Sequence, residues 1–110
     1  MKLKGFATEE GTDKYYRMSQ YEDYNLEVHP DNFKTPFNTN LKLTSIGYGS
    51  YVGGPDDYTD FRMYDSIKTS VLSGGVNVID TAPNYRYMKS EKTIGKIVTT
   101  LDNKYDIKRN

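Results

Sequence analysis

Residues 74–85 read Gly-Gly-Val-Asn-Val-Ile-Asp-Thr-Ala-Pro-Asn-Tyr. Within this stretch, Val76, Val78 and Ile79 form a short β-branched run between a double glycine and a proline, which is typical of a buried parallel strand. The run ends at Asp80. Because ligands of α/β proteins bind at the carboxyl ends of parallel strands, Asp80 is expected to lie at a functional site.

A tyrosine follows this acid within the span of one turn. Tyr85 comes five residues after Asp80, and the turn between them contains Pro83, so a carboxylate and a phenol can face one pocket. A phenol has a pKa of about 10 and is a poor acid near neutral pH unless a nearby cation lowers that pKa. A carboxylate alone would raise it. Proton transfer from Tyr85 therefore needs a third, cationic group, and no lysine of the sequence is an obvious candidate.

These residues resemble the aldo-keto reductase signature, in which Asp-Thr-Ala, a Tyr five residues after the Asp, and Ser-Glu before an apolar-Gly pair occur together. The matching residues here are Asp80-Thr81-Ala82, Tyr85, Ser90-Glu91 and Gly95. The resemblance implies a (β/α)8 barrel that reduces a small carbonyl substrate with NADP(H). In that family the catalytic set is the Asp, the Tyr, a Lys ending the third strand and a His ending the fourth. Asp80 and Tyr85 take the first two roles, and the Lys and the His have no counterpart here.

The expected first barrel strand covers Thr44–Ser50. Gly47 and Gly49 permit close approach of the backbone to a ligand or to crowded neighbouring strands. In the family that the chain resembles, a matching Gly-x-Gly-Thr segment borders the nicotinamide. The resemblance therefore implies cofactor contacts from four residues: Gly49, Ser50, Tyr51 and Asp80.

A helix is expected between the two strands. It begins near Pro55-Asp56-Asp57, because a carboxylate can cap the free N–H groups of a helix start, and it ends at Gly74-Gly75. Its apolar side chains recur every three or four residues and are expected to form one packed face: Tyr58, Phe61, Tyr64, Ile67, Val71 and Leu72. Together with the strands, this helix makes a unit of βαβ size.

A second helix is expected to start at Ser90-Glu91, where helix capping explains both residues, and to close at Asn103. Its packed face is expected to consist of Ile94, Ile97, Val98 and Leu101. Before this helix the chain departs from the family, in which Gly often follows the Tyr. Arg86 is expected to crowd the entrance of the substrate site or to change its charge. The substrate class therefore stays open. Lys89 could in principle supply the missing cation. However, it is expected in a loop just before the next helix, and the family has no counterpart of it.

The sequence divides into an extension, residues 1–36, and a barrel-like part, residues 37–110. The extension is polar and rich in tyrosines that follow no helix or strand period. Two interpretations are open: an irregular lead-in, or an arm that grips a partner or folds back on the barrel, since Tyr offers a large contact area at low entropy cost. A short hairpin is expected at residues 37–43, around Asn-Thr-Asn. The only histidine, His29, lies in the extension and is not expected to replace the family's His.

Length and composition limit the possible classes of protein. The chain has 110 residues, whereas a complete barrel takes about 250, so the expected fold is the N-terminal portion of a (β/α)8 TIM barrel with its first two β/α units. Fifteen basic and fifteen acidic residues cancel, which argues against a nucleic-acid partner. Cysteine is absent, which excludes disulfides and thiolate metal sites. No apolar run predicts a secretory signal or a membrane span, and the expected location is cytoplasmic.

Two functions of different class remain. The first is the N-terminal part of an NADPH-dependent aldo-keto reductase, with Tyr85 as general acid and no activity expected from these 110 residues alone. The second is a reductase-derived, non-catalytic subunit of a larger assembly, in which a protein partner covers the open edge of the sheet. The mean hydropathy of -0.80 shows a chain too polar to bury a large core by itself, and this fits either function.

Overall fold

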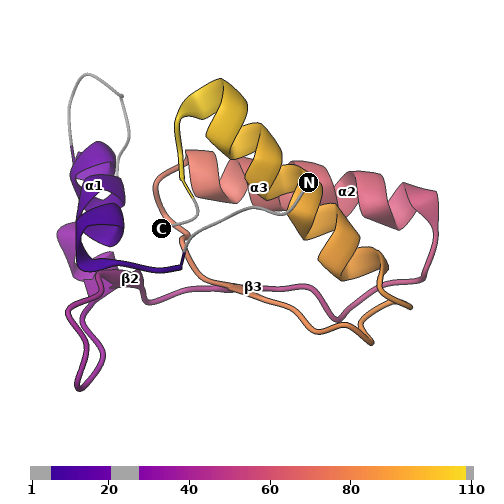
Figure 1. The fold of residues 1–110 in the computed structure, drawn as a ribbon, viewed down its shortest axis with the longest axis horizontal. Helices are drawn as coiled ribbons and strands as arrows, with labels where there is room; N and C mark the ends of the chain where they lie inside the picture. The colour runs from indigo at the N-terminus through magenta and orange to yellow at the C-terminus, as the bar shows by residue number, and fades with distance from the viewer. Residues whose placement is uncertain (1–5, 21–27, 109–110) are drawn as a thin grey trace.

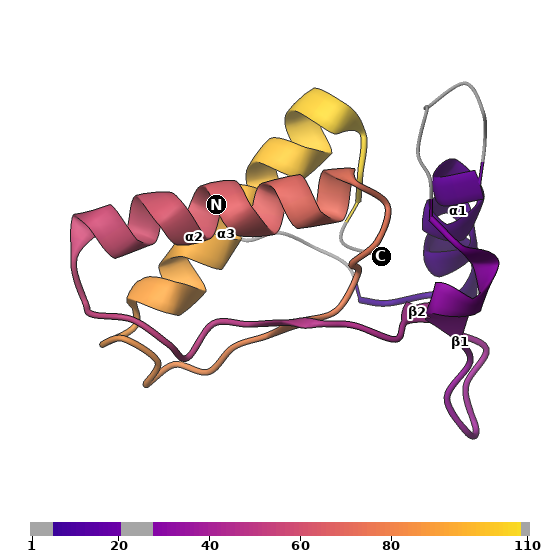
Figure 2. The ribbon, with the colours of Figure 1, turned by 180° about the vertical axis from the view of Figure 1, so that it is seen from behind.

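A computed structural model describes residues 6–20 and 28–108 (Figure 1). The elements are, in order, α1 (Glu9–Gln20), the 3-10 turn η2 (Pro30–Asn32), β1 (Phe33–Lys34), β2 (Leu43–Thr44), β3 (Tyr48–Gly49), α2 (Asp57–Leu72), β4 (Ile79–Asp80) and α3 (Lys89–Tyr105). In Figures 1 and 2, α2 and α3 cover one side of the β3 and β4 segments, and α1 stands with the β1–β2 hairpin at one end of the molecule.

The strands β3 and β4 pair in parallel, as the sequence predicts for a β-helix-β unit. Tyr48 lies opposite Ile79 and Gly49 opposite Asp80. Both strands are only two residues long, and in the described part of the chain each pairs only with the other. The predicted parallel strand is confirmed at Ile79–Asp80 only, and its expected burial is wrong, because a strand with a single neighbour leaves its apolar side chains half-buried. The barrel itself stays a prediction, since many α/β folds contain such a unit.

The N terminus of α2 is confirmed as predicted. Asp56 is the N-cap, and its carboxylate accepts a hydrogen bond of 2.7 Å from the Thr59 N–H. The prediction of the buried face is partly wrong, because Tyr58 and Phe61 are 69% and 70% exposed and Met63 is buried instead. At 100° per residue, both aromatic side chains point roughly 150° away from Met63, on the side of α2 opposite the core.

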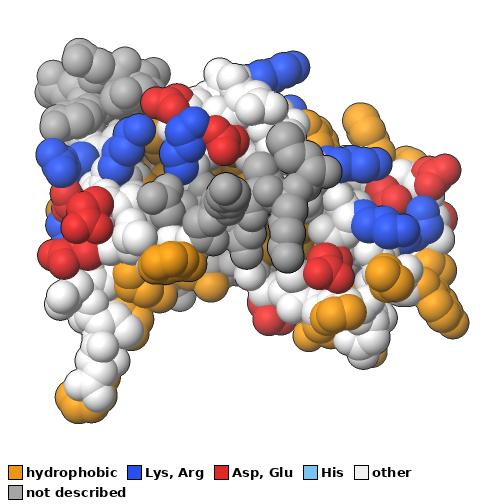
Figure 3. All heavy atoms as spheres, viewed as in Figure 1, with side chains coloured by type: hydrophobic (Ala, Val, Ile, Leu, Met, Phe, Trp, Pro, Cys, Tyr) orange, Lys and Arg blue, Asp and Glu red, His pale blue; other side chains and the backbone are white. Residues whose placement is uncertain are grey.

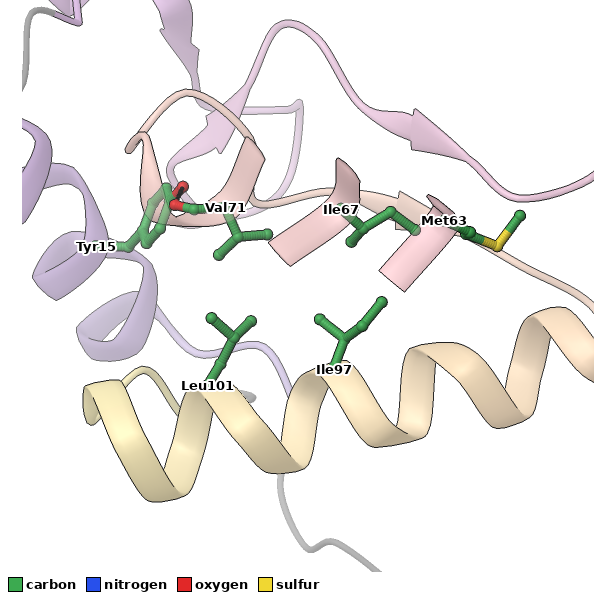
Figure 4. Close-up of a cluster of buried hydrophobic side chains, with 6 residues drawn as sticks. All are labelled: Tyr15, Met63, Ile67, Val71, Ile97 and Leu101. Carbon is green, nitrogen blue, oxygen red and sulfur yellow. Dashed lines mark hydrogen bonds between the residues drawn. The ribbon is translucent and has the colours of Figure 1, made fainter. Parts of the chain in front are cut away.

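The core lies between α2 and α3 and is closed at one end by α1. Figure 4 shows the buried cluster, which consists of Tyr15, Met63, Ile67, Val71, Ile97 and Leu101. The predicted face of α3 is therefore confirmed at Ile97 and Leu101. This helix runs past the expected end at Asn103 to Tyr105, where Asp106 takes the left-handed cap conformation at φ 54° and donates its N–H to the Leu101 carbonyl.

The helix α1 corrects the expectation that no helical period runs through the extension. Tyr15 is the side chain that joins α1 to the core, and its hydroxyl lies 2.6 Å from the Val71 carbonyl and 2.7 Å from the Val76 carbonyl. Burial raises the pKa of Tyr15 above its usual value, because the hydrogen bond to Val76 compensates only part of the lost hydration. Of the two open interpretations, this contact agrees with an arm that folds back. Tyr21 and Tyr24 lie outside the described residues.

The predicted hairpin exists, but its strands lie further apart in sequence. Phe33 pairs with Thr44 and Lys34 with Leu43, in antiparallel register. The turn closes where the Thr39 N–H donates to the Pro36 carbonyl at 3.1 Å. The expected boundary between residues 36 and 37 therefore falls inside the hairpin.

Candidate functional site at the carboxyl ends of the strands

Asp80 is the last residue of β4, and its side chain is exposed. Within the described residues its carboxylate makes no hydrogen bond or ion pair. Its neighbour across the strand pair is Gly49, where an added Cβ would meet nothing within 4 Å. At Gly47 the same atom would lie 3.2 Å from the Val78 carbonyl. Gly47 therefore permits close strand packing, whereas Gly49 leaves open space beside the acid.

Two buried serines hold the strand ends to the start of α3. The Ser50 hydroxyl donates to the Asp80 carbonyl at 2.6 Å, and the Ser90 hydroxyl donates to the Ser50 carbonyl at the same distance. Both side chains are fully buried. The expectation that Ser90 caps α3 is wrong, because the N-cap is Met88 and no side chain caps it. The cofactor contact inferred for Ser50 stays a prediction, although its hydroxyl is buried and already engaged.

Tyr85 lies half-buried in the loop after β4. Its ring packs edge-on against the ring of Tyr51, with centroids 5.1 Å apart and an interplanar angle of 76°. Within the described residues, no hydrogen bond joins Tyr85 to Asp80. The structure thus places both predicted catalytic residues at the same end of the strand pair, and it brings the phenol against Tyr51 rather than against the acid.

A shallow hollow of about 420 Å³ lies between the loops that follow β3 and β4. It is lined by Tyr51, Val52, Gly53, Pro55, Asn84, Arg86 and Tyr87. Tyr51, for which the resemblance implies a cofactor contact, is among these residues. Exposed hydrophobic side chains surround this end of the molecule, and Figure 3 shows them over the strand ends and the start of α2.

Arg86 lines this hollow, but its charge is paired inside the protein, so of the two effects expected from the sequence, crowding and a change of charge, the change of charge is not supported. Its side chain is only 1% exposed and forms an ion pair with Asp60. The guanidinium also donates to two backbone carbonyls, those of Gly54 at 2.8 Å and Asp56 at 3.2 Å. The positive charge is therefore compensated inside the protein.

Lys89 is also paired with α2. Its ammonium lies 3.1 Å from Asp57 and 3.2 Å from Asp60, and these hydrogen bonds raise the pKa of Lys89. Burial tends to raise the pKa of Asp60, but hydrogen bonds from Arg86 and Lys89 outweigh burial and lower it. With its ammonium held by two carboxylates, Lys89 does not act as the cation that Tyr85 requires.

The sequence provides no signal for the backbone of the segment 86–88. Arg86, Tyr87 and Met88 have φ angles of 52°, 54° and 71°, so three consecutive residues that are not glycine occupy the left-handed region. Each such residue costs about 1–2 kcal/mol relative to the right-handed form. This loop is therefore strained immediately after the predicted catalytic tyrosine.

The sequence marks Thr81 only as part of the Asp80-Thr81-Ala82 match and does not indicate its surroundings. Its hydroxyl oxygen is buried and has no hydrogen-bond partner among the described residues. Buried polar groups in proteins are normally paired, so this unpaired hydroxyl is an exception within the described residues.

Comparison with known proteins does not identify a relative. A scan against models of protein families found no match, and searches of curated proteins and of solved structures found none either. None of the helices in residues 6–20 and 28–108 combines the length and apolarity needed to cross a membrane. The same residues hold no group of three or more His, Cys, Asp or Glu that could bind a metal ion.

Proposed function

We propose that this chain supplies the acid and the phenol of a carbonyl-reducing site of the aldo-keto reductase type, with NADP(H) as cofactor. The observation that carries the proposal is the position of Asp80 at the exposed end of a parallel strand, beside the open space at Gly49. Tyr85 lies in the loop that follows, as the signature requires. Active sites of α/β barrels form at this end of the strands.

In this reaction the bound nicotinamide supplies a hydride to the carbonyl carbon. Tyr85 donates its phenolic proton to the carbonyl oxygen, which completes the alcohol. Asp80 orients a cation that lowers the pKa of the phenol. Lys89, the lysine nearest in sequence to Tyr85, is paired with Asp57 and Asp60, so the proposal takes that cation to be a lysine from further polypeptide.

Two features of the site fit a cofactor and further protein. At Gly49 an added Cβ would meet nothing within 4 Å, so a ligand could approach the backbone opposite Asp80. The unpaired hydroxyl of Thr81 offers a donor and an acceptor for a polar group that the described residues do not supply. The contacts inferred for Gly49, Ser50 and Tyr51 belong to this proposal.

One observation favours the second function, a non-catalytic subunit. In the described part of the chain, β3 and β4 pair only with each other, so the outer edge of each strand is free to receive a strand from another protein. In such an assembly, a strand of the partner would pair with the free edge of β3 or β4, and Asp80 would have no catalytic role.

The test uses the native polypeptide that carries these residues. We expect it to oxidise NADPH in the presence of small aldehydes, and we expect Tyr85→Phe to lower kcat by about 10²–10⁴-fold because the general acid is lost. Tyr105→Phe, at an exposed position on α3, is the matched control and should keep the wild-type rate. Equal rates in wild type and Tyr85→Phe would reject the role of Tyr85. No turnover of any aldehyde, together with stable association with another protein, would favour the non-catalytic subunit.

A further inference from the structure

We propose that Arg86 is a positioning residue that fixes the phenol of Tyr85. In this view its buried guanidinium joins the strained loop after β4 to the loop after β3 and to the first turn of α2. The catalytic consequence rests on the proposed function, whereas the structural consequence can be measured without it.

The contacts of Arg86 reach two other segments. Its guanidinium donates to the carbonyls of Gly54 and Asp56, which precede α2, and forms an ion pair with Asp60 in the first turn of that helix. A guanidinium is planar and carries five donors in a fixed fork, so it can serve several acceptors in different directions. Lysine has a single ammonium and cannot reproduce this set.

The strain of the segment 86–88 shows why such an anchor is needed. All three residues are left-handed, and two of their side chains bury little surface, since Tyr87 is 85% exposed and Met88 is 51% exposed. Arg86 is the buried side chain of the three. Strained backbone persists only where the surrounding structure stabilises it. Here the contacts of Arg86 stabilise the segment 86–88.

The same contacts bring Tyr85 and Tyr51 together. Tyr85 precedes Arg86 directly, and Tyr51 belongs to the loop whose Gly54 carbonyl accepts from Arg86. When Arg86 joins the two loops, the rings of Tyr51 and Tyr85 come to lie 5.1 Å apart, which limits the positions open to the phenol. A general acid must lie within hydrogen-bond reach of its substrate, so a loss of this restraint lowers the rate.

The experiment compares Arg86→Met with Arg62→Met by amide hydrogen exchange in the native polypeptide. Arg62 is an exposed arginine on α2 that contacts Tyr58, so its replacement controls for the loss of one arginine. We expect the amides of residues 85–90 to exchange at least about tenfold faster in Arg86→Met, with no change in the second half of α3, because the opening is local. Arg62→Met should exchange like the wild type.

A second measurement tests the catalytic consequence. In the reductase, Arg86→Met should lower kcat by about 10–100-fold and leave the KM for NADPH unchanged, and Arg86→Lys should restore only part of the rate. Unchanged exchange at residues 85–90, or equally faster exchange along the whole chain, would overturn the inference. Faster exchange confined to residues 85–90, in a protein without reductase activity, would support the structural role of Arg86 and reject the proposed function. Failure of the inference about Arg86 and failure of the proposed function can therefore be distinguished.

Discussion

The two ends of the β3–β4 pair differ in how their polar groups are satisfied. At the amino end, Thr44 and Asn77 exchange hydrogen bonds: the Thr44 N–H donates to the Asn77 side chain at 2.8 Å, and the Asn77 N–H donates to the Thr44 hydroxyl at 3.1 Å. The Asn77 side chain also donates to the Lys42 carbonyl at 2.9 Å. At the carboxyl end, the Asp80 carboxylate and the Thr81 hydroxyl have no such partner among the described residues.

This difference separates an end of the strand pair that side-chain hydrogen bonds hold from the end at which the proposed function places its chemistry. Side chains at the amino end replace the ladder hydrogen bonds that two-residue strands cannot make, and Tyr15 closes the same end from α1. The carboxyl end instead holds an unpaired acid, open space at Gly49 and three strained residues. Strain and unpaired polar groups collect where function requires them, and the rest of the fold compensates for their cost.

The largest expected effect on stability is at the amino end. Asn77→Ala removes two side-chain hydrogen bonds, one to Lys42 and one to Thr44, and should lower the free energy of unfolding by about 2–3 kcal/mol. Asp80→Asn, at the other end of the same strand, should change it by less than about 0.5 kcal/mol while it lowers the proposed reductase activity. Urea unfolding monitored by circular dichroism measures both values. If the two variants were equally destabilised, the comparison between the two ends would fail.

A smaller loss is expected at Tyr15. Tyr15→Phe keeps the buried ring and removes the hydroxyl that bonds the Val71 and Val76 carbonyls. It should therefore lower the free energy of unfolding by about 1–2 kcal/mol. Tyr16→Phe is the matched control on the same helix, because its hydroxyl makes no hydrogen bond within the described residues, and it should stay within about 0.5 kcal/mol of the wild type. Equal stability of the two variants would show that the hydrogen bonds of the Tyr15 hydroxyl do not stabilise the contact between α1 and the core.

A modest gain is expected at the carboxyl end. Met88→Gly places glycine at φ 71°, where the left-handed backbone costs it nothing, and should stabilise the chain by about 0.5–1 kcal/mol after the entropy of the added glycine is counted. Lys92→Gly, at an exposed interior position of α3, should instead cost about 1 kcal/mol. Thermal unfolding distinguishes the two signs, and a loss at both positions would contradict strain in the segment 86–88.

The smallest effect expected is on the acid dependence of stability. Hydrogen bonds from Thr59, first from its backbone N–H, lower the pKa of Asp56 below its ordinary value of 3.8. A group with a lowered folded pKa stabilises the fold above its unfolded pKa, and this contribution is lost as the pH falls through the folded value. The free energy of unfolding should therefore decrease as the pH is lowered below about 4. Asp56→Asn keeps the cap without titrating, so its unfolding free energy should depend less on pH in that range, and an unchanged pH profile would contradict this role.

Much of the fold follows from local signals. The start of α2 is readable because a carboxylate at Asp56 caps the N–H groups beside it, and its end is readable from Gly74-Gly75. The buried face of α3 follows from the spacing of Ile97 and Leu101. The positions of Asp80 and Tyr85 relative to the strand end also follow from sequence order, because strand, turn and loop succeed one another along the chain.

Contacts between distant residues account for the rest. The helix α1 packs through Tyr15 against carbonyls that lie 56 and 61 residues further along the chain, so its contact with the core is known only from the folded structure. Ser90 resembles a helix cap in sequence, yet its hydroxyl bonds Ser50, and Arg86 resembles a charged pocket residue, yet Asp60 neutralises it. Propensity and spacing describe a residue and its near neighbours, whereas the partner of a buried polar group is known only once the segments have packed together.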